Sequence, residues 1–205
     1  MKISLRGAFL IILIVFLTAF SLTFQSAIDV GVSMYPTCAD GDMLLVRKLY
    51  REDTINRGDV VYLNLDSAEY PALGNATKLL KRVIAVAGDE VRIEETGLYV
   101  NGELQRESYV SLPNWYEEDT IYGVWQISEG KVFVMGDNRP YSYDSRNFGE
   151  VSEDSIVGKL FLNLTEKTGV TDLTYRVLVC VLGSVLFILI FYKYLIKGDK
   201  KNVKV

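Results

Sequence analysis

The chain of 205 residues contains no histidine and only two cysteines, Cys38 and Cys180. Without histidine, a Ser-His-Asp triad, a Cys-His dyad and imidazole-based metal sites are all excluded. Two cysteines are too few for a four-cysteine zinc site or a disulfide framework. A formal net charge of −4 argues against a general nucleic-acid-binding protein, which is normally basic. With no phosphate loop or cofactor motif either, the sequence predicts no metal, no cofactor and no nucleic-acid partner.

Charge is also missing from two long stretches of the chain. Residues 7–28 are uncharged over 22 positions, which exceeds the about 20 residues that cross a bilayer core. Residues 177–192 form a second apolar run, which Arg176 and Lys193 can extend by snorkelling. A cleaved signal peptide is the alternative for the first run, and a buried core helix is the alternative for the second. We expect both runs to be helices that cross a lipid bilayer.

Basic residues flank these two runs on their outer sides. Lys2 and Arg6 precede the first run, and five lysines follow the second. Because cytoplasmic flanks carry the excess of Lys and Arg, both termini should be cytoplasmic and the acidic middle segment should lie outside the cell membrane. The expected organisation is a short tail and anchor at residues 1–28, an extracytoplasmic domain at 29–175, a transmembrane helix at 176–196 and a basic tail at 197–205.

Short β-branched and apolar stretches, separated by turn signals, fill the middle segment. Asn101-Gly102 is the strongest two-residue hairpin signal in the chain. No long amphipathic helical pattern appears, so the sequence predicts a mainly β domain built from an antiparallel sheet or barrel. Residues 107–129 mix aromatic and acidic side chains and are expected to be irregular. The expected strands are residues 43–46, 59–65, 82–87, 90–94, 98–100, 103–104, 131–135 and 156–164.

A hydrolase that lacks histidine can activate a hydroxyl group with a neutral lysine. A free lysine has a pKa of about 10.4, and burial in apolar surroundings lowers it. Lys81 lies at the start of a predicted buried strand and is the candidate base. Ser33 lies in a turn that Pro36 prevents from becoming helical, and it is the candidate nucleophile. Taken singly, each has a simpler interpretation, because turn serines are usually structural and strand lysines usually face solvent.

A third polar cluster follows the strand expected at residues 131–135. It reads Gly136-Asp137-Asn138-Arg139 and then Ser142-Tyr143-Asp144-Ser145-Arg146. Its simplest interpretation is a charged loop whose side chains bind one another.

Together and in this order, these segments resemble those of bacterial type I signal peptidases, which are membrane-bound serine proteases with a Ser-Lys dyad. The resemblance covers about residues 28–165. It implies a barrel-like antiparallel β-sheet catalytic domain of the kind shared by signal peptidases and LexA-like proteins. The matching segments are Ser33-Met34-Tyr35-Pro36-Thr37, Arg57-Gly58-Asp59-Val60-Val61, Lys81-Arg82-Val83 through Gly88-Asp89, and the polar cluster after residue 135.

The resemblance assigns roles to individual residues. Ser33 is expected to be the nucleophile and Lys81 the general base, with the Ser142 hydroxyl orienting the lysine amine. Asp137 is expected to pair with Arg82, and Asp144 with Arg146. Some family members carry a serine two positions before the nucleophile that helps to bind the oxyanion; here that position is Gly31, so the Ser33 N–H would act without this side-chain donor.

The resemblance also implies a substrate class. It would be the signal peptide of a secreted preprotein, cut after small residues at the −1 and −3 positions. An extended substrate could add to an edge strand near Ser33, with shallow apolar pockets for its side chains. The residues expected to line these pockets are Val30, Val32, Met34, Val83, Ile84 and Ala85.

Other interpretations fit less of the chain. Self-cleaving repressors of the LexA type share the dyad and the β fold, but they are soluble DNA-binding proteins, which the two apolar runs exclude. Ser128-x-x-Lys131 and Lys167-Thr168-Gly169 match motifs of penicillin-binding enzymes, but Gly130 and the β-rich residues after it disfavour the helix that the first motif must begin. A peptidase dedicated to pilins or a few surface proteins stays open, as does a signal-peptidase-like partner in pilus assembly.

Overall fold

The computed structural model describes residues 5–74, 77–110 and 121–165. The chain divides into two compact units, one of which is the β-rich unit Thr23–Leu164. The described part of the other unit is Thr165 and residues 5–22, which make up helix α1 (Leu5–Thr23) except for its last residue. The two units are described one at a time.

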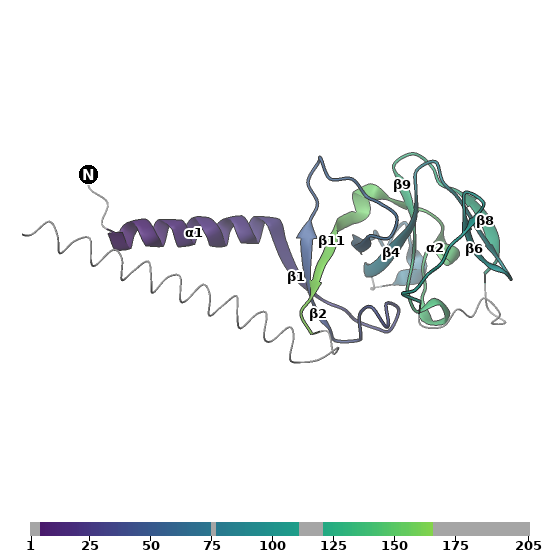
Figure 1. The fold of residues 1–205 in the computed structure, drawn as a ribbon, viewed down its shortest axis with the longest axis horizontal. Coiled ribbons are helices and arrows are strands. Elements are labelled where there is room, and N and C mark those ends of the chain that lie inside the picture. Colours follow the sequence, from purple (N-terminus) through teal and green to yellow (C-terminus); the bar gives the residue numbers. More distant parts are fainter. Residues whose placement is uncertain (1–4, 75–76, 111–120, 166–205) are drawn as a thin grey trace, which may run out of the picture. The chain divides into compact units, whose positions relative to one another are not determined.

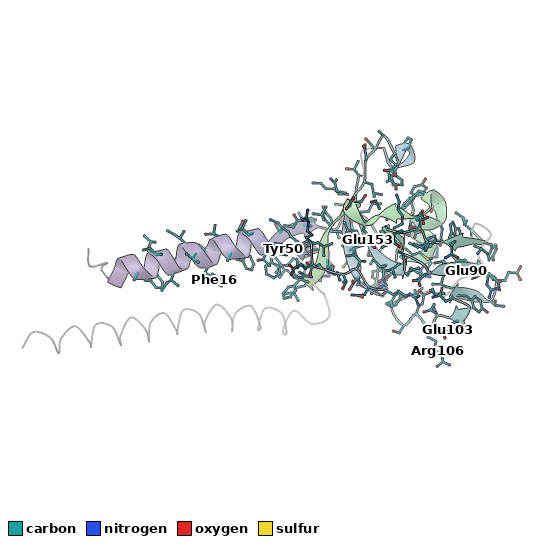
Figure 2. The ribbon with its side chains drawn as sticks, turned by 90° about the horizontal axis from the view of Figure 1, so that it is seen from above. Phe16, Tyr50, Glu90, Glu103, Arg106 and Glu153 are labelled. Carbon is teal, nitrogen blue, oxygen red and sulfur yellow. The ribbon has the colours of Figure 1, made fainter. Side chains whose placement is uncertain are left out.

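Helix α1 carries large apolar side chains that are open to the surroundings. Leu10, Phe16 and Leu22 are 56%, 63% and 65% exposed, and Figure 2 shows Phe16 projecting from the helix. Over the described ranges, no helix has both the length and the apolar character needed to cross a membrane. The helix also ends earlier than the uncharged run, which continues to Ile28. The second expected helix, at residues 176–196, and the tail at 197–205 lie outside the described residues.

Strand β1 replaces the last part of the uncharged run. Phe24–Ile28 pairs antiparallel with β2, from Phe24 opposite Arg47 to Ile28 opposite Met43. Ala27 is buried in this strand while Ile28 is 62% exposed, so the segment has the alternation of a half-buried strand. Hydropathy alone did not separate this strand from the helix before it.

The β-rich unit contains a seven-stranded and a four-stranded antiparallel sheet (Figure 1). The prediction of a mainly β antiparallel domain is confirmed. Figure 1 shows the four-stranded sheet, marked by β6 and β8, on the side of this unit away from β1. In sheet order, the larger sheet consists of β1, β2 (Met43–Lys48), β11 (Ile156–Asn163), β3 (Val60–Asn64), β4 (Lys78–Val86), β9 (Lys131–Met135) and β10 (Val151–Ser152). The smaller sheet consists of β7 (Glu103–Leu104), β6 (Gly97–Val100), β5 (Glu90–Glu94) and β8 (Gly123–Gln126).

The turns follow the sequence signals in most places. Asn101 and Gly102 join β6 to β7 with φ values of 52° and 79°, the left-handed geometry that a tight hairpin turn requires. Strand β8 differs from the expectation, since it forms within the segment expected to be irregular. A short helix α2 (Ser145–Phe148) follows β9, and single 3₁₀ turns lie at Pro71–Leu73, Arg139–Tyr141 and Glu153–Ser155.

Three hydrophobic clusters hold the β-rich unit together. The first packs β3, β4 and β9 around Val61, Val83 and Val134. The second joins the two sheets, with Ile84 and Phe133 from the larger sheet and others from the smaller. The third, which we call the β1–β2 cluster, consists of Ala27, Met34, Cys38, Leu44, Val46 and Leu80. It lies beneath the turn that carries Ser33.

Candidate active site

Ser33 and Lys81 come together although 48 positions separate them in the sequence: the Lys81 Nζ lies 2.6 Å from the Ser33 Oγ. Lys81 comes from β4, the central strand that is hydrogen-bonded to β3 on one edge and β9 on the other. Its side chain is 3% exposed, whereas Ser33 is half-buried. The nucleophile candidate is therefore reachable from outside, and the base candidate is held behind it.

The charge state of Lys81 results from opposing contributions. Burial is the largest and lowers the pKa of the amine, because the charged form loses its water. The carboxylates of Asp144, Asp29 and Asp137 raise the pKa, and the guanidinium of Arg146 lowers it. The net effect is a pKa below the usual lysine value, which favours the neutral amine that a general base requires.

The turn that carries Ser33 is fixed by hydrogen bonds on both sides. Asn138 binds it twice: its backbone N–H donates to the Ser33 carbonyl, and its Nδ2 donates to the Val32 carbonyl, both at 2.9 Å. On the other side, the Gly31 N–H donates to Asp40 Oδ1 at 2.8 Å. Gly31 has a φ of +106°, a conformation that side-chain-bearing residues rarely adopt. Asn138 thus positions the nucleophile, a role that its place in a polar loop did not reveal.

Gly136 allows three parts of the site to approach closely. A Cβ atom at this position would lie 2.2 Å from Ser142 Oγ and 2.5 Å from the Ser33 carbonyl oxygen. No real side chain tolerates such contacts. The loop after β9 therefore packs directly on the Ser33 turn because residue 136 is a glycine.

Arg82 and Asp137 form a bidentate ion pair beside the dyad. The Arg82 Nε and Nη2 atoms lie 2.8 and 2.6 Å from the two Asp137 oxygens. The Asp137 carboxylate is fully buried and also accepts the Thr37 hydroxyl, while Arg82 Nη1 donates to the Gly58 carbonyl at 2.9 Å. The Arg82 guanidinium also lies 3.9 Å from the centre of the Tyr109 ring. This network connects β4, the loop after β9 and the Ser33 turn.

Asp144 and Arg146 form a second bidentate pair. The Arg146 Nε and Nη2 atoms lie 2.8 and 2.9 Å from the Asp144 oxygens. Asp144 also caps helix α2 and accepts the Gly136 N–H at 2.9 Å. Because both partners are almost fully buried, this pair fixes the loop after β9 from within.

Ser142 is close to the site, but its hydroxyl does not make the expected contact. The Ser142 Oγ is buried and has no hydrogen-bond partner among the described residues. The expected hydrogen bond to the Lys81 amine is therefore absent, and the amine is in contact with Ser33 instead. Arg146 Nη2 binds the Ser142 carbonyl at 3.2 Å and fixes the backbone at this position.

The residues expected to line the substrate pockets fall into two groups. Val30 and Val32 are 85% and 50% exposed and can contact a substrate. Met34, Val83 and Ala85 are fully buried and Ile84 is 5% exposed. The expectation that Met34 and Ala85 line an open pocket is corrected. The physical reason is that β4 is paired along both edges and Ala85 fills the second hydrophobic cluster, while Met34 fills the β1–β2 cluster. Val83 and Ile84 line a small pocket together with Arg57, Leu98 and Tyr109.

Asp29 and Cys38 are buried groups near the dyad. Burial raises the pKa of the Cys38 thiol to about 12, so the thiol stays protonated and inert. Burial likewise raises the pKa of Asp29 to about 6, and Lys81 partly opposes this shift. Asp29 received no role from its sequence, since a carboxylate next to an apolar strand carries no recognisable motif.

Within residues 5–74, 77–110 and 121–165, no group of three His, Cys, Asp or Glu side chains is placed to hold a metal ion.

Comparison with known proteins assigns the chain to a family. A family model described as signal peptidase, peptidase S26, matches residues 2–165, which include every residue of the site. The chain belongs to the S26 signal peptidase family. This S26 chain is 36% identical over 131 residues to the probable signal peptidase I-2 of Synechocystis sp., covering 63% of this chain and 58% of that protein. It is 35% identical over 139 residues to signal peptidase I V of Bacillus subtilis, covering 62% of this chain and 78% of that protein.

One solved structure of an S26-type protein is also similar. The crystal structure of a signal peptidase I from Enterococcus faecalis V583 has 27% sequence identity and a TM-score of 0.42. The match covers 53% of this chain and 97% of that one. The S26 chain spans less than two thirds of the length of its Synechocystis relative.

Proposed function

We propose that this S26 chain is a serine endopeptidase that removes signal peptides from secreted preproteins, with Ser33 as nucleophile and Lys81 as general base. The observation that carries the proposal is the 2.6 Å contact between the Ser33 hydroxyl and a buried lysine whose pKa is lowered. The names of its relatives, signal peptidases of Synechocystis and Bacillus subtilis, support the same reaction.

The reaction proceeds through an acyl-enzyme. The Ser33 Oγ attacks the scissile carbonyl carbon while its proton passes to the neutral Lys81 amine. The resulting ammonium donates that proton to the leaving amine as the C–N bond breaks. A water molecule then gives a proton to Lys81 and attacks the ester, which releases the signal peptide and restores Ser33. The Ser33 N–H would bind the oxyanion without a side-chain donor from Gly31.

The accessible surface next to Ser33 suggests how the substrate binds. Because both edges of β4 are occupied, an extended peptide would lie along the exposed Val30 and Val32. Main-chain hydrogen bonds would supply affinity, and small side chains at the −1 and −3 positions would fit beside the turn.

We also propose that the chain is anchored in the cell membrane. The uncharged residues 7–28 and the exposed apolar side chains of α1 support contact with a lipid bilayer. The basic flanks support a two-pass topology with both termini in the cytoplasm and the β-rich unit outside. Flotation of the protein with lipid vesicles, and labelling of single cysteines placed in each tail from either side of a cell, would test the anchoring and the topology separately.

Cleavage of a preprotein tests the catalytic proposal. Purified full-length protein in detergent is incubated with a preprotein that carries Ala at −1 and −3. Ser33→Ala and Lys81→Met are expected to abolish cleavage while circular dichroism stays unchanged. Ser26→Ala and Lys78→Met serve as matched controls, because both residues are exposed on β1 and β4. A fully active Lys81→Met variant would contradict the dyad, whereas an inactive wild type would favour a dedicated pilin peptidase or an assembly partner.

A further inference from the structure

Asp29 is a buried carboxyl group at the end of β1. Its side chain is 7% exposed, and its Oδ2 atom is buried without a hydrogen-bond partner in the described structure. The backbone is fixed, because the Asp29 N–H donates to the Asp42 carbonyl and the Asp29 carbonyl accepts the Gly41 N–H, both at 2.9 Å. These bonds extend the β1–β2 ladder by one residue and keep Asp29 on the same face as the buried Ala27.

Asp29 lies four residues before Ser33, whose Oγ is 2.6 Å from Lys81 Nζ, and its backbone bonds to Asp42 and Gly41 fix it at the start of the turn that leads to the dyad. It raises the pKa of the Cys38 thiol, a member of the β1–β2 cluster, and of the Tyr62 hydroxyl, which packs against that cluster. It also raises the pKa of Lys81, which in turn lowers the pKa of Asp29. The Asp29 carboxylate and the Lys81 amine therefore act on each other's charge, and both belong to segments that meet at Ser33.

Asp29 differs from the other carboxylates that act on Lys81. Asp144 is neutralised by the bidentate Arg146, and Asp137 is neutralised in the same way by Arg82. No salt bridge to Asp29 occurs in the part of the chain that the structure describes. The cation that acts on its pKa is Lys81 itself, while Asp42 and Asp40 repel its charge.

We propose that Asp29 is a positioning residue whose carboxylate stabilises the Lys81 ammonium that forms when Ser33 loses its proton. This inference rests on the proposed function, since it concerns the base of that reaction. Asp29 itself exchanges no proton with the substrate. The proton moves from Ser33 Oγ to Lys81 Nζ and later to the leaving amine, and the carboxylate balances the positive charge between these two transfers.

The Asp29 carboxylate would lower the energy of the Lys81 ammonium, as a charged side chain does when it orients and stabilises a protonated catalytic base. Burial alone would make Lys81 neutral but also a weak base, and base strength contributes to the rate. The Asp29 carboxylate, which has no salt bridge within the described ranges, raises the pKa of the amine and restores part of that strength. Since the pKa of Asp29 is about 6, the carboxylate is ionised at neutral and alkaline pH, where neutral Lys81 is available.

The test compares Asp29→Asn and Asp29→Glu with wild type in the full-length protein. Glu90→Gln is the matched control, because it also removes one carboxylate charge, and Glu90 is exposed on β5 of the smaller sheet, away from the Ser33 turn. The first readout is the pH dependence of kcat on a preprotein. The second is the pH titration of the Lys81 ¹³Cε resonance, assigned as the signal lost in Lys81→Met.

In Asp29→Asn, we expect the acidic limb of kcat to move to lower pH by about one pH unit and the plateau to fall about tenfold, the usual size of one opposite-charge contact. Asp29→Glu should retain most of the wild-type profile, and Glu90→Gln all of it. A limb that stays in place in Asp29→Asn would overturn the inference even if kcat fell, and so would an equal shift in Glu90→Gln. If wild type does not cleave, the proposed function fails and the Lys81 titration decides: a lower midpoint in Asp29→Asn supports the inference, and an unchanged one overturns it.

Discussion

At the scale of single residues, the reactivity of Lys81 depends on how completely β4 removes it from water. Burial lowers the pKa of the amine more than the surrounding carboxylates raise it. The same surroundings keep the Cys38 thiol protonated. One dry environment thus favours the neutral amine that the proposed base requires and keeps the nearby thiol unreactive.

The activity should depend on pH in a direction set by Lys81. Because the neutral amine is the active form in the proposed mechanism and its pKa is lowered, kcat should rise with pH and level off below the ordinary lysine pKa of about 10.4. Initial rates on a preprotein between pH 5 and about 10.5 would show this limb. A limb centred at the ordinary lysine value would contradict the effect of burial.

Asp29 should make stability depend on pH as well. Its pKa is about 6 in the folded chain and 3.8 for the free group, so its contribution to stability is fully present below 3.8 and is lost as the pH rises through about 6. Asp29→Asn cannot ionise and should therefore have a higher Tm than wild type at pH 8, with a smaller difference at pH 5. Calorimetry at the two pH values measures this, and an equal gain at both would show that ionisation is not the cause. A larger gain at pH 8 than at pH 5 would show that the ionised Asp29 carboxylate lowers the stability of the protein while it serves the proposed catalytic role.

Gly136→Ala should reduce activity by displacing the Ser33 turn. The added methyl group would overlap Ser142 Oγ and the Ser33 carbonyl oxygen, and relieving such overlap costs about 1–3 kcal/mol. We expect a lower Tm and a fall in kcat larger than the change in KM, because the nucleophile moves relative to Lys81. Gly130→Ala is the control, since a Cβ there meets nothing within 4 Å. Its φ of +67° costs stability without touching the dyad, so it should leave kcat unchanged.

At the scale of elements, the site depends on the contact between β4 and the loop after β9. Arg82 and Asp137 join these elements through two hydrogen bonds in a setting where Asp137 is fully buried. Removing one member of a buried pair leaves the other charge without a partner.

Asp137→Ala should therefore destabilise the protein by about 3–5 kcal/mol, as measured by urea unfolding. Glu94→Ala, which breaks the exposed pair between Arg92 and Glu94, is the control and should change stability far less. Equal losses in the free energy of unfolding in the two variants would show that the buried pair of Arg82 and Asp137 stabilises the protein no more than an exposed pair does.

The sequence predicted the elements that have clear periodicity and missed those that depend on their neighbours. Strands β2, β5, β9 and β11 lie where alternating or β-branched runs placed them. Strand β1 was hidden in an apolar run that continues from the helix, and β8 in a segment of mixed aromatic and acidic residues. For the site, the motifs identified Ser33 and Lys81. The role of Asn138 follows from hydrogen bonds across more than 100 positions, and the role proposed for Asp29 from a charge interaction across 52, which no local pattern encodes.

At the scale of the whole molecule, the β-rich unit holds every residue of the candidate site. It extends from Thr23 to Leu164, and its three hydrophobic clusters are formed within it. A unit with its own core can fold alone.

A fragment of residues 24–165 should therefore unfold cooperatively and cleave a short soluble peptide with the −1 and −3 alanines. It should lose the preference of the full-length protein for preproteins embedded in lipid vesicles, because it lacks the exposed apolar side chains of α1. Thermal unfolding and the ratio of rates on the two substrates test both statements. A fragment that folds but cleaves neither substrate would show that α1 contributes to the site itself.

The four-stranded sheet is attached to the rest of the unit through the second hydrophobic cluster and supplies neither Ser33 nor Lys81. Its hairpins can therefore lengthen, shorten or change sequence during evolution while the separation of the two reacting atoms stays constant. Divergence between lineages is expected to accumulate in this sheet, and a peptide tag or a second binding module could be inserted at the Asn101-Gly102 turn without loss of chemistry. The larger sheet has no such freedom, because a shift of one residue in β4 would turn Lys81 to the opposite face.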